Sequence, residues 1–248
     1  MPDFDFTGKV AIVTGASRGI GRFLSQALTK RGASVVGTAR KLDSSPGEGG
    51  TLKETADLIG AAGGRFLPVA GSITESPGAQ DVVDRAVAEY GRVDILVNNA
   101  GALIDLSITE MTDEQWESLL SVNVTAPFLM TRAVFPVMKA QGSGNILNVS
   151  SGAGVANPRG TSALYASTKA FLERMTFNFA VEAKEFGIAV NAWQPGILAT
   201  DMNAGRQPGE PVEIIEESTI WLLAQNASAF TGQIVRRNDF GDSWGPNS

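Results

Sequence analysis

The chain has 248 residues, 43% of them hydrophobic, and a formal net charge of −6. It has no histidine and no cysteine, which excludes disulfides, thiolate or imidazole metal ligands, cysteine nucleophiles and the serine–histidine–aspartate triad. The negative charge argues against sequence-independent binding of DNA or RNA, because that binding needs a positive protein face.

The first residues, MPDFDFTGK, lack the basic segment and the apolar stretch of a signal peptide. No apolar run approaches the length that spans a bilayer, so no membrane partner is expected. The carboxylates show no clustered spacing, and we predict no metal site. These features predict a cytoplasmic protein without a nucleic-acid partner.

Short apolar runs alternate with helical stretches along the whole chain. Such strands, without polar alternation, are buried on both faces, and their alternation with helices indicates right-handed βαβ units. We therefore predict an α/β fold: a single doubly wound Rossmann domain over 1–248, with a mostly parallel seven-stranded sheet and helices on both faces. The expected strands are 9–15, 34–38, 65–70, 93–101, 144–151, 188–196 and 232–237, and the clearest helical stretches are 19–32, 78–91 and 112–141. The low-complexity segment 41–51 is expected to be a mobile loop.

The first strand is followed by TGASRGIG (14–21), with glycines at Gly15, Gly19 and Gly21. Glycine permits positive φ and lets backbone amides approach a pyrophosphate, while the next helix directs its N-terminus at that anion. The alternative is a glycine-rich turn without a ligand. The position after the first strand favours a dinucleotide.

The second strand ends in GTAR, where the adenine ribose of a dinucleotide lies in such folds. A site selective for NAD places an acid there, but this chain has Ala39 followed by Arg40. Together with Arg18 in the glycine turn, Arg40 suits a 2′-phosphate. We therefore expect NADP(H) in preference to NAD(H); the alternative is that both arginines are solvated surface charges.

Several separated motifs, in the order in which they occur, resemble the short-chain dehydrogenases/reductases, in the branch with chains of this length. The resemblance runs from Lys9 to about Gln233 and includes TGASRGIG, NNAG (98–101), YASTK (165–169) and QPG (194–196). The long segment after the second strand also resembles hydroxysteroid dehydrogenase-like members.

Four residues match the family's catalytic set: Asn123, Ser151, Tyr165 and Lys169. The resemblance implies that Tyr165 exchanges a proton with a ketone or secondary alcohol while nicotinamide exchanges hydride. It further implies that Ser151 orients the carbonyl, that Lys169 bonds the nicotinamide ribose and that Asn123 holds a proton-relay water.

Elementary chemistry agrees with these roles. Tyr165 and Lys169 are four residues apart, so they share one face of a helix. A free tyrosine has a pKa of about 10, and a nearby ammonium lowers that value. The pair can therefore replace histidine as general acid and base.

The resemblance also assigns residues to the cofactor. One position departs from the family pattern: Ser72 stands where an aspartate usually bonds the adenine amino group. The expected cofactor-binding residues are Gly15, Ser17, Arg18, Gly19, Ile20, Gly21, Arg40, Ser72, Ile73, Asn99, Ala100, Gly101, Tyr165, Lys169, Pro195, Gly196, Ile197 and Thr200.

The substrate is expected to be a small or medium hydrophobic ketone or alcohol, because the candidate wall residues are apolar. Those residues are Leu103, Ile104, Val155, Ile197, Leu198 and Met202. Two other classes stay open: a 3-oxoacyl-carrier-protein reductase, and a non-catalytic dinucleotide-binding or sensor protein. The intact catalytic set argues against the sensor, and the net charge does not help an acidic carrier to bind.

A homotetramer is the expected assembly. The helix over 165–186 has two apolar stripes on nearly opposite sides, formed by Phe171, Met175 and Phe179 and by Phe177 and Val181. A helix on one face of a sheet needs a single stripe, so the second is expected to pack on another subunit.

Overall fold

Seven parallel strands form one sheet in the order β3-β2-β1-β4-β5-β6-β7. The computed structural model describes residues 4–43, 50–154, 163–205 and 208–246. The strands are β1 (Val10–Thr14), β2 (Ser34–Ala39), β3 (Arg65–Ala70), β4 (Ile95–Asn98), β5 (Gly144–Val149), β6 (Ile188–Gln194) and β7 (Ile234–Arg236). All seven expected strands are present, each within three residues of its predicted bounds.

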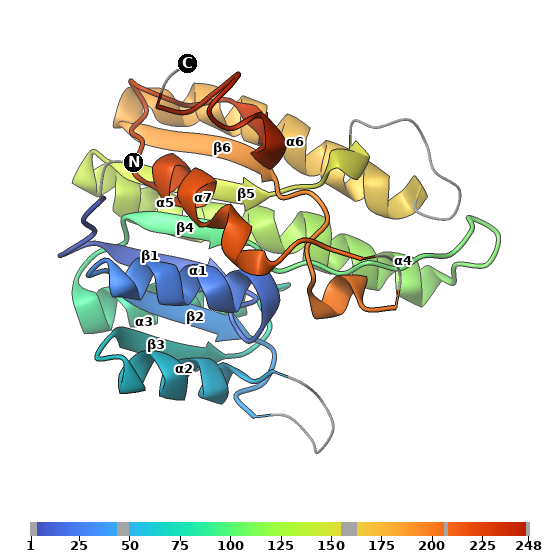
Figure 1. The fold of residues 1–248 in the computed structure, drawn as a ribbon, viewed down its shortest axis with the longest axis horizontal. Helices are drawn as coiled ribbons and strands as arrows, with labels where there is room; N and C mark the ends of the chain where they lie inside the picture. The colour runs from blue at the N-terminus through green and yellow to red at the C-terminus, as the bar shows by residue number, and fades with distance from the viewer. Residues whose placement is uncertain (1–3, 44–49, 155–162, 206–207, 247–248) are drawn as a thin grey trace.

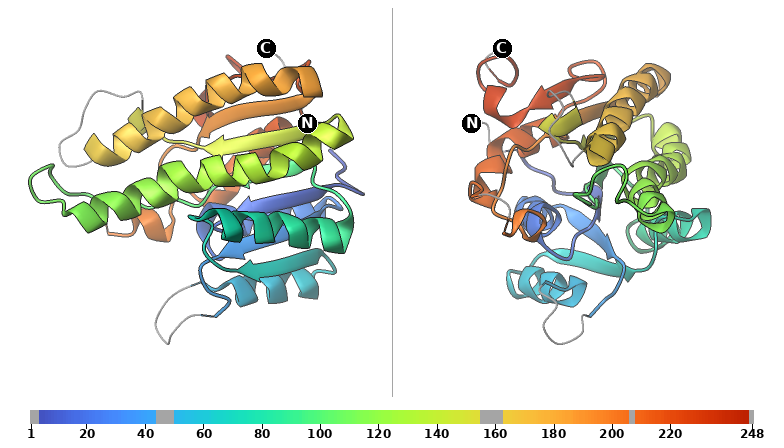
Figure 2. Two further views of the ribbon diagram at one scale, coloured as in Figure 1. Left: turned by 180° about the vertical axis from the view of Figure 1, so that it is seen from behind. Right: turned by 90° about the vertical axis from the view of Figure 1, so that its right-hand side faces the viewer.

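Helices cover both faces of the sheet, as predicted. Figure 1 shows α1, α2 and α7 in front of the strands, and Figure 2 shows α3, α4, α5 and α6 on the opposite face. The α-helices are α1 (Gly19–Lys30), α2 (Leu52–Ala61), α3 (Ser76–Tyr90), α4 (Asp113–Leu120), α5 (Ala126–Gln141), α6 (Ala163–Ala183) and α7 (Glu216–Leu223). The shorter turns are η1 (Ser121–Thr125), η2 (Gly152–Gly154), η4 (Lys184–Phe186), η5 (Asp201–Asn203), η6 (Val212–Ile215) and η7 (Arg237–Asp239).

The apolar core is divided between the two faces of the sheet. Successive strand residues point to opposite faces, so Val13 packs against α1 and α7 while Ile12 packs against α3 and α5. Both side chains are fully buried. Trp193 in β6 is buried in the same way, so it belongs to the core and not to a pocket wall. This packing holds the strands rigidly and fixes where their carboxyl ends lie.

The predicted helix over 112–141 is interrupted. It is divided into α4, the π-helical turn η1 and α5. Pro127, in the first turn of α5, has no N–H to donate to the residue four positions earlier, which is Asn123. A π-turn accommodates that missing bond, and such turns occur often at functional sites. The interruption therefore places Asn123 at a distorted point of the helix.

By length and composition, the stretch Asp113–Gln141 would also suffice to cross a bilayer, contrary to the expectation from the sequence. Half of its most apolar window is buried inside the protein. Side chains of α5 belong to the core cluster between the sheet and α3. The stretch thus packs as a core helix.

Asp94 anchors the end of the sheet that is remote from the strands' carboxyl ends. It is buried, accepts a hydrogen bond from the Val10 N–H, and forms ion pairs with Lys9 and Arg92. Burial opposes its ionisation, but the hydrogen bonds from Arg92 and Val10 and the charge of Lys9 outweigh burial and lower the pKa. Asp94 therefore ties the start of β1 to β4.

Candidate active site

The strand order reverses between β1 and β4, and their carboxyl ends are joined there by short polar contacts. Asn99, just after β4, donates through Nδ2 to the carbonyl oxygens of Thr14, at 2.8 Å, and Gly15, at 3.2 Å. The N–H groups of Asn99 and Ala100 donate to Thr14 Oγ1. Ligands of doubly wound sheets bind at such a switch point.

Only glycine fits at two positions of the turn after β1. Gly15 has φ +67°, a conformation that other residues rarely adopt. A Cβ added to Gly21 would overlap the Gly15 carbonyl oxygen and lie 2.6 Å from Asn99 Nδ2. The glycines therefore let α1 begin directly against the end of β1. This close approach is what a pyrophosphate cradle requires.

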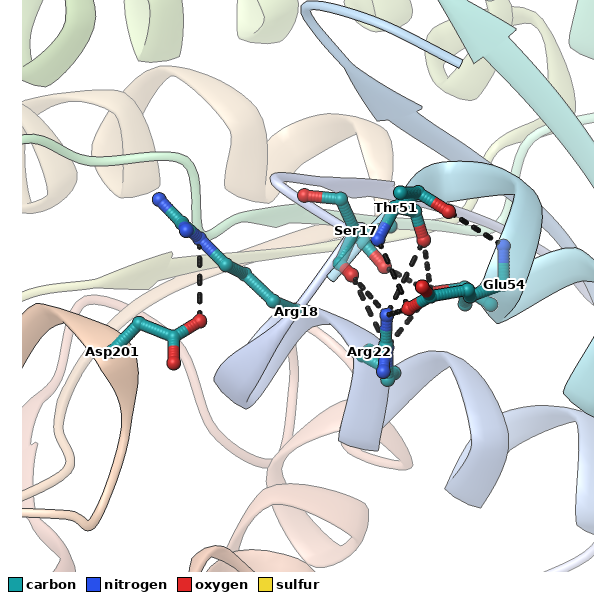
Figure 3. Close-up of polar contacts among 8 residues, drawn as sticks. Ser17, Arg18, Arg22, Thr51, Glu54 and Asp201 are labelled. Atoms are coloured by element: carbon teal, nitrogen blue, oxygen red, sulfur yellow. Dashed lines mark hydrogen bonds and ion pairs between the residues drawn. The ribbon is translucent and has the colours of Figure 1, made fainter. Parts of the chain in front are cut away.

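The N-terminus of α1 opens toward a cleft. Its N-cap residue, Arg18, is extended and its guanidinium cannot accept a bond from the helix N–H groups. An unsatisfied helix N-terminus of this kind favours an anion. Arg18 instead forms an exposed ion pair with Asp201, its Nε 3.5 Å from the carboxylate (Figure 3). Arg18 thus reaches the segment after β6 and not, in this arrangement, the adenine end.

Arg22 links the glycine turn to α2, a role that the sequence analysis did not predict. Its Nη2 donates to the carbonyl of Ser17 at 2.7 Å and to Glu54 at 2.8 Å (Figure 3). Glu54 completes a capping box with Thr51 at the start of α2. The first turn of α2 is therefore connected through Arg22 to the backbone of the turn.

A cleft of about 800 Å³ lies over the glycine turn and the neighbouring strand ends. Arg40 is exposed and Ala39 half-buried at the rim, where an adenine ribose was expected. Ser72 shares a hydrogen bond of 2.8 Å with the Thr74 hydroxyl, so a neutral polar pair replaces the family's aspartate. The predicted cofactor residues that line the cleft are Gly15, Ser17, Arg18, Gly19, Ile20, Arg40, Ser72, Ile73, Asn99, Ala100, Gly101 and Thr200.

The predicted proton-transfer residues lie together behind the Gly101 side of this cleft. Tyr165 and Lys169, both on α6, have the Lys169 Nζ 5.8 Å from the centre of the Tyr165 ring. The Ser151 side chain lies near enough to the Tyr165 phenol to act to lower its pKa. A Cβ added to Gly101 would lie 3.7 Å from Lys169 Nζ and 3.5 Å from Asn123 Oδ1. The lysine and the asparagine therefore border the same backbone.

Asn123 is fully buried, and its side-chain amide both accepts and donates hydrogen bonds. Its Oδ1 accepts the Ala102 N–H at 2.8 Å, and its Nδ2 donates to the Ala102 carbonyl at 2.9 Å and to Thr168 Oγ1 at 3.0 Å. These bonds fix the chain after β4 against η1 and α6. These bonds give Asn123 a role in positioning the backbone after β4, in addition to the proposed role of holding a proton-relay water.

The pKa of Tyr165 differs from the expectation. Burial of the phenol raises the pKa above its ordinary value, and the Ser151 side chain only partly opposes that effect. The sequence predicts that the charge of Lys169 lowers the pKa of Tyr165, and burial acts against that effect. The Lys169 Nζ instead donates to the Val149 carbonyl at 2.9 Å, and burial lowers its own pKa to about 8. Burial therefore favours the protonated phenol of Tyr165 and the neutral amine of Lys169.

The QPG segment is held by a residue that sequence reasoning missed. Arg237 Nε donates to the Pro195 carbonyl at 2.8 Å, and its guanidinium forms an ion pair with Glu210. Gly196 next to it has φ +79°. Pro195, Gly196 and Ile197 do not line the cleft, but Thr200 lies 3.5 Å from the position of a Cβ on Gly19. The segment after β6 thus closes one side of the cleft.

The candidate substrate wall is only partly assembled. Leu103 and Met202 line the cleft, and Leu198 is buried in the core. Ile104 is half-buried and Ile197 is exposed outside the cleft. Val155 and most of the loop at 41–51 lie outside the described residues.

Comparison with known proteins decides the family. Residues 9–211 match the short chain dehydrogenase family.

The chain belongs to the short-chain dehydrogenase/reductase family.

Its relatives share nearly the whole length of the chain. It is 34% identical to the 3-oxoacyl-[acyl-carrier-protein] reductase FabG of Salmonella typhimurium, over 94% of this chain and 97% of that protein. It is 33% identical to glucose 1-dehydrogenase 2 of Bacillus subtilis, with 92% of each chain covered.

Solved structures agree. A short-chain type dehydrogenase/reductase from Mycobacterium marinum superposes with a TM-score of 0.85, at 28% identity and 94% coverage of both chains. A protein described as an NAD(P)-dependent gluconate 5-dehydrogenase from Beutenbergia cavernae, with NADP bound at low occupancy, has the same TM-score, at 29% identity over 95% of this chain and 97% of that one.

Membership makes this protein an oxidoreductase that binds a nicotinamide dinucleotide and acts on small molecules. The residues of the cleft fit such a cofactor. The glycine cradle leaves no room for a Cβ at Gly21, and the start of α1 offers N–H groups to a pyrophosphate.

Proposed function

We propose that this enzyme interconverts a ketone and a secondary alcohol with NADP(H), and that Tyr165 transfers the proton. One observation carries the proposal: the Tyr165 phenol, with Ser151 near it, lies beside the buried ammonium of Lys169, next to the cleft that fits the cofactor. In a chain with no histidine, this pair is the group best suited to acid–base catalysis.

The roles follow from position and charge. The bound nicotinamide supplies or accepts the hydride. The Ser151 hydroxyl donates to the substrate oxygen and stabilises the charge that develops on it. Tyr165 gives its proton to the same oxygen in reduction and takes it back in oxidation. The positive charge of Lys169 favours the phenolate and opposes the effect of burial on Tyr165.

Cofactor preference rests on the rim of the cleft. At Ala39 no carboxylate accepts from a ribose 2′-hydroxyl or repels a 2′-phosphate, and Arg40 is exposed beside it. Charge-assisted contacts of a guanidinium with a phosphate are worth about 1.5–3 kcal/mol before solvent losses. Asp201 pairs with Arg18, so we assign the larger part of the preference to Arg40.

A 3-oxoacyl-carrier-protein reductase is the second candidate, favoured by the near full-length similarity to FabG. Its net charge of −6 opposes an acidic carrier. Comparing the turnover of two substrates distinguishes the two candidate functions. A free ketone, turned over as fast as a carrier-bound 3-oxoacyl thioester, supports the first, and a strong preference for the thioester supports the second.

We also propose a cytoplasmic homotetramer built on exposed apolar side chains of α5 and α6. Phe171 is 49%, Phe177 48% and Val181 70% exposed on α6, and Phe128 on α5 is 39% exposed. Of the two stripes inferred from the sequence, Met175 is buried and Phe179 is half-buried, whereas Phe171 joins the exposed set. Large exposed apolar patches of this kind indicate an interface.

Replacing Tyr165 with phenylalanine should lower ketone reduction by 10²-fold or more, about the contribution of one acid–base group, and leave cofactor affinity nearly unchanged. The change removes a hydroxyl and little packing. Turnover and the cofactor dissociation constant are measured together. The matched control is Tyr90→Phe, at the chain's second tyrosine, which should retain activity. Tyr165→Phe activity within about tenfold of the parent would refute the mechanism.

Replacing Arg40 with alanine should reduce the NADP-over-NAD ratio of kcat/KM by about tenfold, because one charge-assisted phosphate contact is lost. Both cofactors are assayed with the same ketone. Arg85→Ala, on the outer side of α3 where Arg85 pairs with Asp81, is the control and should leave the ratio unchanged. A parent that prefers NAD, or a ratio that Arg40→Ala does not alter, contradicts the assignment.

Sedimentation of the parent at micromolar concentration should give a tetramer. Val181→Asp places a charge in the exposed apolar set and should give smaller species. Leu58→Asp on α2, at a side chain that is 49% exposed, is the control and should leave the assembly intact. A monomeric parent would show that the apolar side chains of α5 and α6 do not join subunits.

A further inference from the structure

The carboxylate of Glu173 is buried one helical turn after Lys169. Glu173 is 3% and Lys169 5% exposed, and both belong to α6. Residues four apart lie on the same side of a helix. A buried carboxylate is costly unless it is hydrogen-bonded or paired with a cation. Glu173 is therefore not an ordinary solvated charge on the helix surface, and groups inside the protein must stabilise its carboxylate.

Two neutral groups bond one oxygen of this carboxylate. Glu173 Oε1 accepts from Ser150 Oγ and from Gln194 Nε2, each at 2.7 Å. Glu173 Oε2 lies beside Gly154, 3.3 Å from the position of an added Cβ. Both donors are uncharged, so they stabilise the carboxylate without cancelling its charge. Two donors on a single oxygen are the arrangement expected for the ionised form.

The donors lie next to the candidate active site. Ser150 precedes Ser151, and Gln194 precedes the Pro195–Gly196 turn. Gln194 is buried, and its Oε1 has no hydrogen-bond partner among the described residues. Within those residues, the side chain of Gln194 therefore forms a single hydrogen bond, from Nε2 to Glu173. Glu173 thus connects the ends of β5 and β6 to the helix that carries Tyr165 and Lys169.

Neutral groups surround Lys169 on the other elements packed against α6. Its Nζ donates to the Val149 carbonyl of β5, and Asn123 from η1 borders the same backbone at Gly101. Tyr165 on α6 is the neighbouring titratable group. Within 4–43, 50–154, 163–205 and 208–246, Glu173 is the one charged group that raises the pKa of Lys169, against burial, which lowers it to about 8.

We propose that Glu173 is a positioning residue, the buried counter-charge that keeps Lys169 protonated next to Tyr165. The inference rests on the proposed function, because that function assigns the proton chemistry to Tyr165 and Lys169. Glu173 does not line the cleft and acts through the lysine. Without its charge, Lys169 would lose its proton at a lower pH, and Tyr165 would lose the cation beside it.

The test is Glu173→Gln, which keeps the volume and an accepting oxygen for Ser150 and Gln194 but removes the charge. We expect the alkaline limb of kcat/KM for ketone reduction to move to lower pH by about one unit, the effect of losing a nearby opposite charge. Well below that limb, kcat/KM should stay close to the parent value. A purely structural glutamate would lower stability and leave the limb in place.

Asp94→Asn is the matched control. Asp94 is also a buried carboxylate, 6% exposed, at the opposite ends of the strands. It should destabilise the fold and leave the alkaline limb unchanged. If Glu173→Gln leaves the limb where the parent has it, or if Asp94→Asn moves it equally, the proposal is wrong. If Glu173→Gln does not fold, Glu173→Asp replaces it, because the shorter side chain withdraws the charge by one methylene. The alkaline limb should then move to lower pH by a smaller amount than expected for Glu173→Gln. An alkaline limb that does not move in Glu173→Asp would contradict the proposal.

A direct titration separates this proposal from the proposed function. Labelling the lysine ε-carbons with ¹³C, with the Lys169 resonance assigned by its loss in Lys169→Met, gives the Lys169 midpoint without turnover. The midpoint should fall in Glu173→Gln. If the parent reduces no ketone, the proposed function fails while the titration still tests Glu173. If the parent is active and the midpoint does not move, the counter-charge role fails and the function stands.

Discussion

The burial of the Lys169 amino group is the constraint on which the rest of the candidate active site depends. An ammonium removed from water loses its proton readily, and the pKa near 8 reflects that cost. The protein compensates with a backbone carbonyl, from Val149, and a buried carboxylate, from Glu173. Both compensating groups require β5 and α6 to be held in fixed positions by the core. The proton chemistry of a chain without histidine thus depends on the packing of the sheet.

The cofactor cleft depends on a second constraint, the close approach of backbone at the switch point. Gly21 faces the Gly15 carbonyl so closely that no side chain fits, and Asn99 bridges β1 and β4 in the same place. Arg22 and Glu54 brace this turn from the side of α2. The glycine turn therefore brings main-chain groups to the cleft, which suits a ligand whose charge is on phosphate.

The sequence predicted the parts of the molecule that local pattern determines. Short apolar runs located all seven strands, because parallel strands buried on both faces have no polar alternation. The spacing of the YASTK motif predicted that Tyr165 and Lys169 lie on one side of α6, and the fold also brings Ser151 near the phenol. The interruption at Asn123 was missed, although Pro127, four residues later, is the signal that could have indicated it.

Other features come from tertiary contacts that spacing does not encode. Arg22, Gln194 and Arg237 form hydrogen bonds with residues far along the chain, and nothing in their local sequence distinguishes them from ordinary polar residues. Glu173 follows Lys169 by four positions, so helical periodicity alone could have flagged it. The effect of burial on the pKa of Tyr165 could not be predicted from the sequence, because burial of the phenol depends on the packed fold.

The central claim is that Tyr165 transfers the proton, and the chain's small number of tyrosines permits a direct test. In a Tyr90→Phe background Tyr165 is the one tyrosine left, so global incorporation of fluorotyrosine changes a single phenol. Fluorination lowers the pKa of the phenol with little change in its size. The pH profile of alcohol oxidation, in which Tyr165 acts as the base, should then move to lower pH by a comparable amount. Superimposable profiles for the fluorinated and unmodified enzymes would contradict the account.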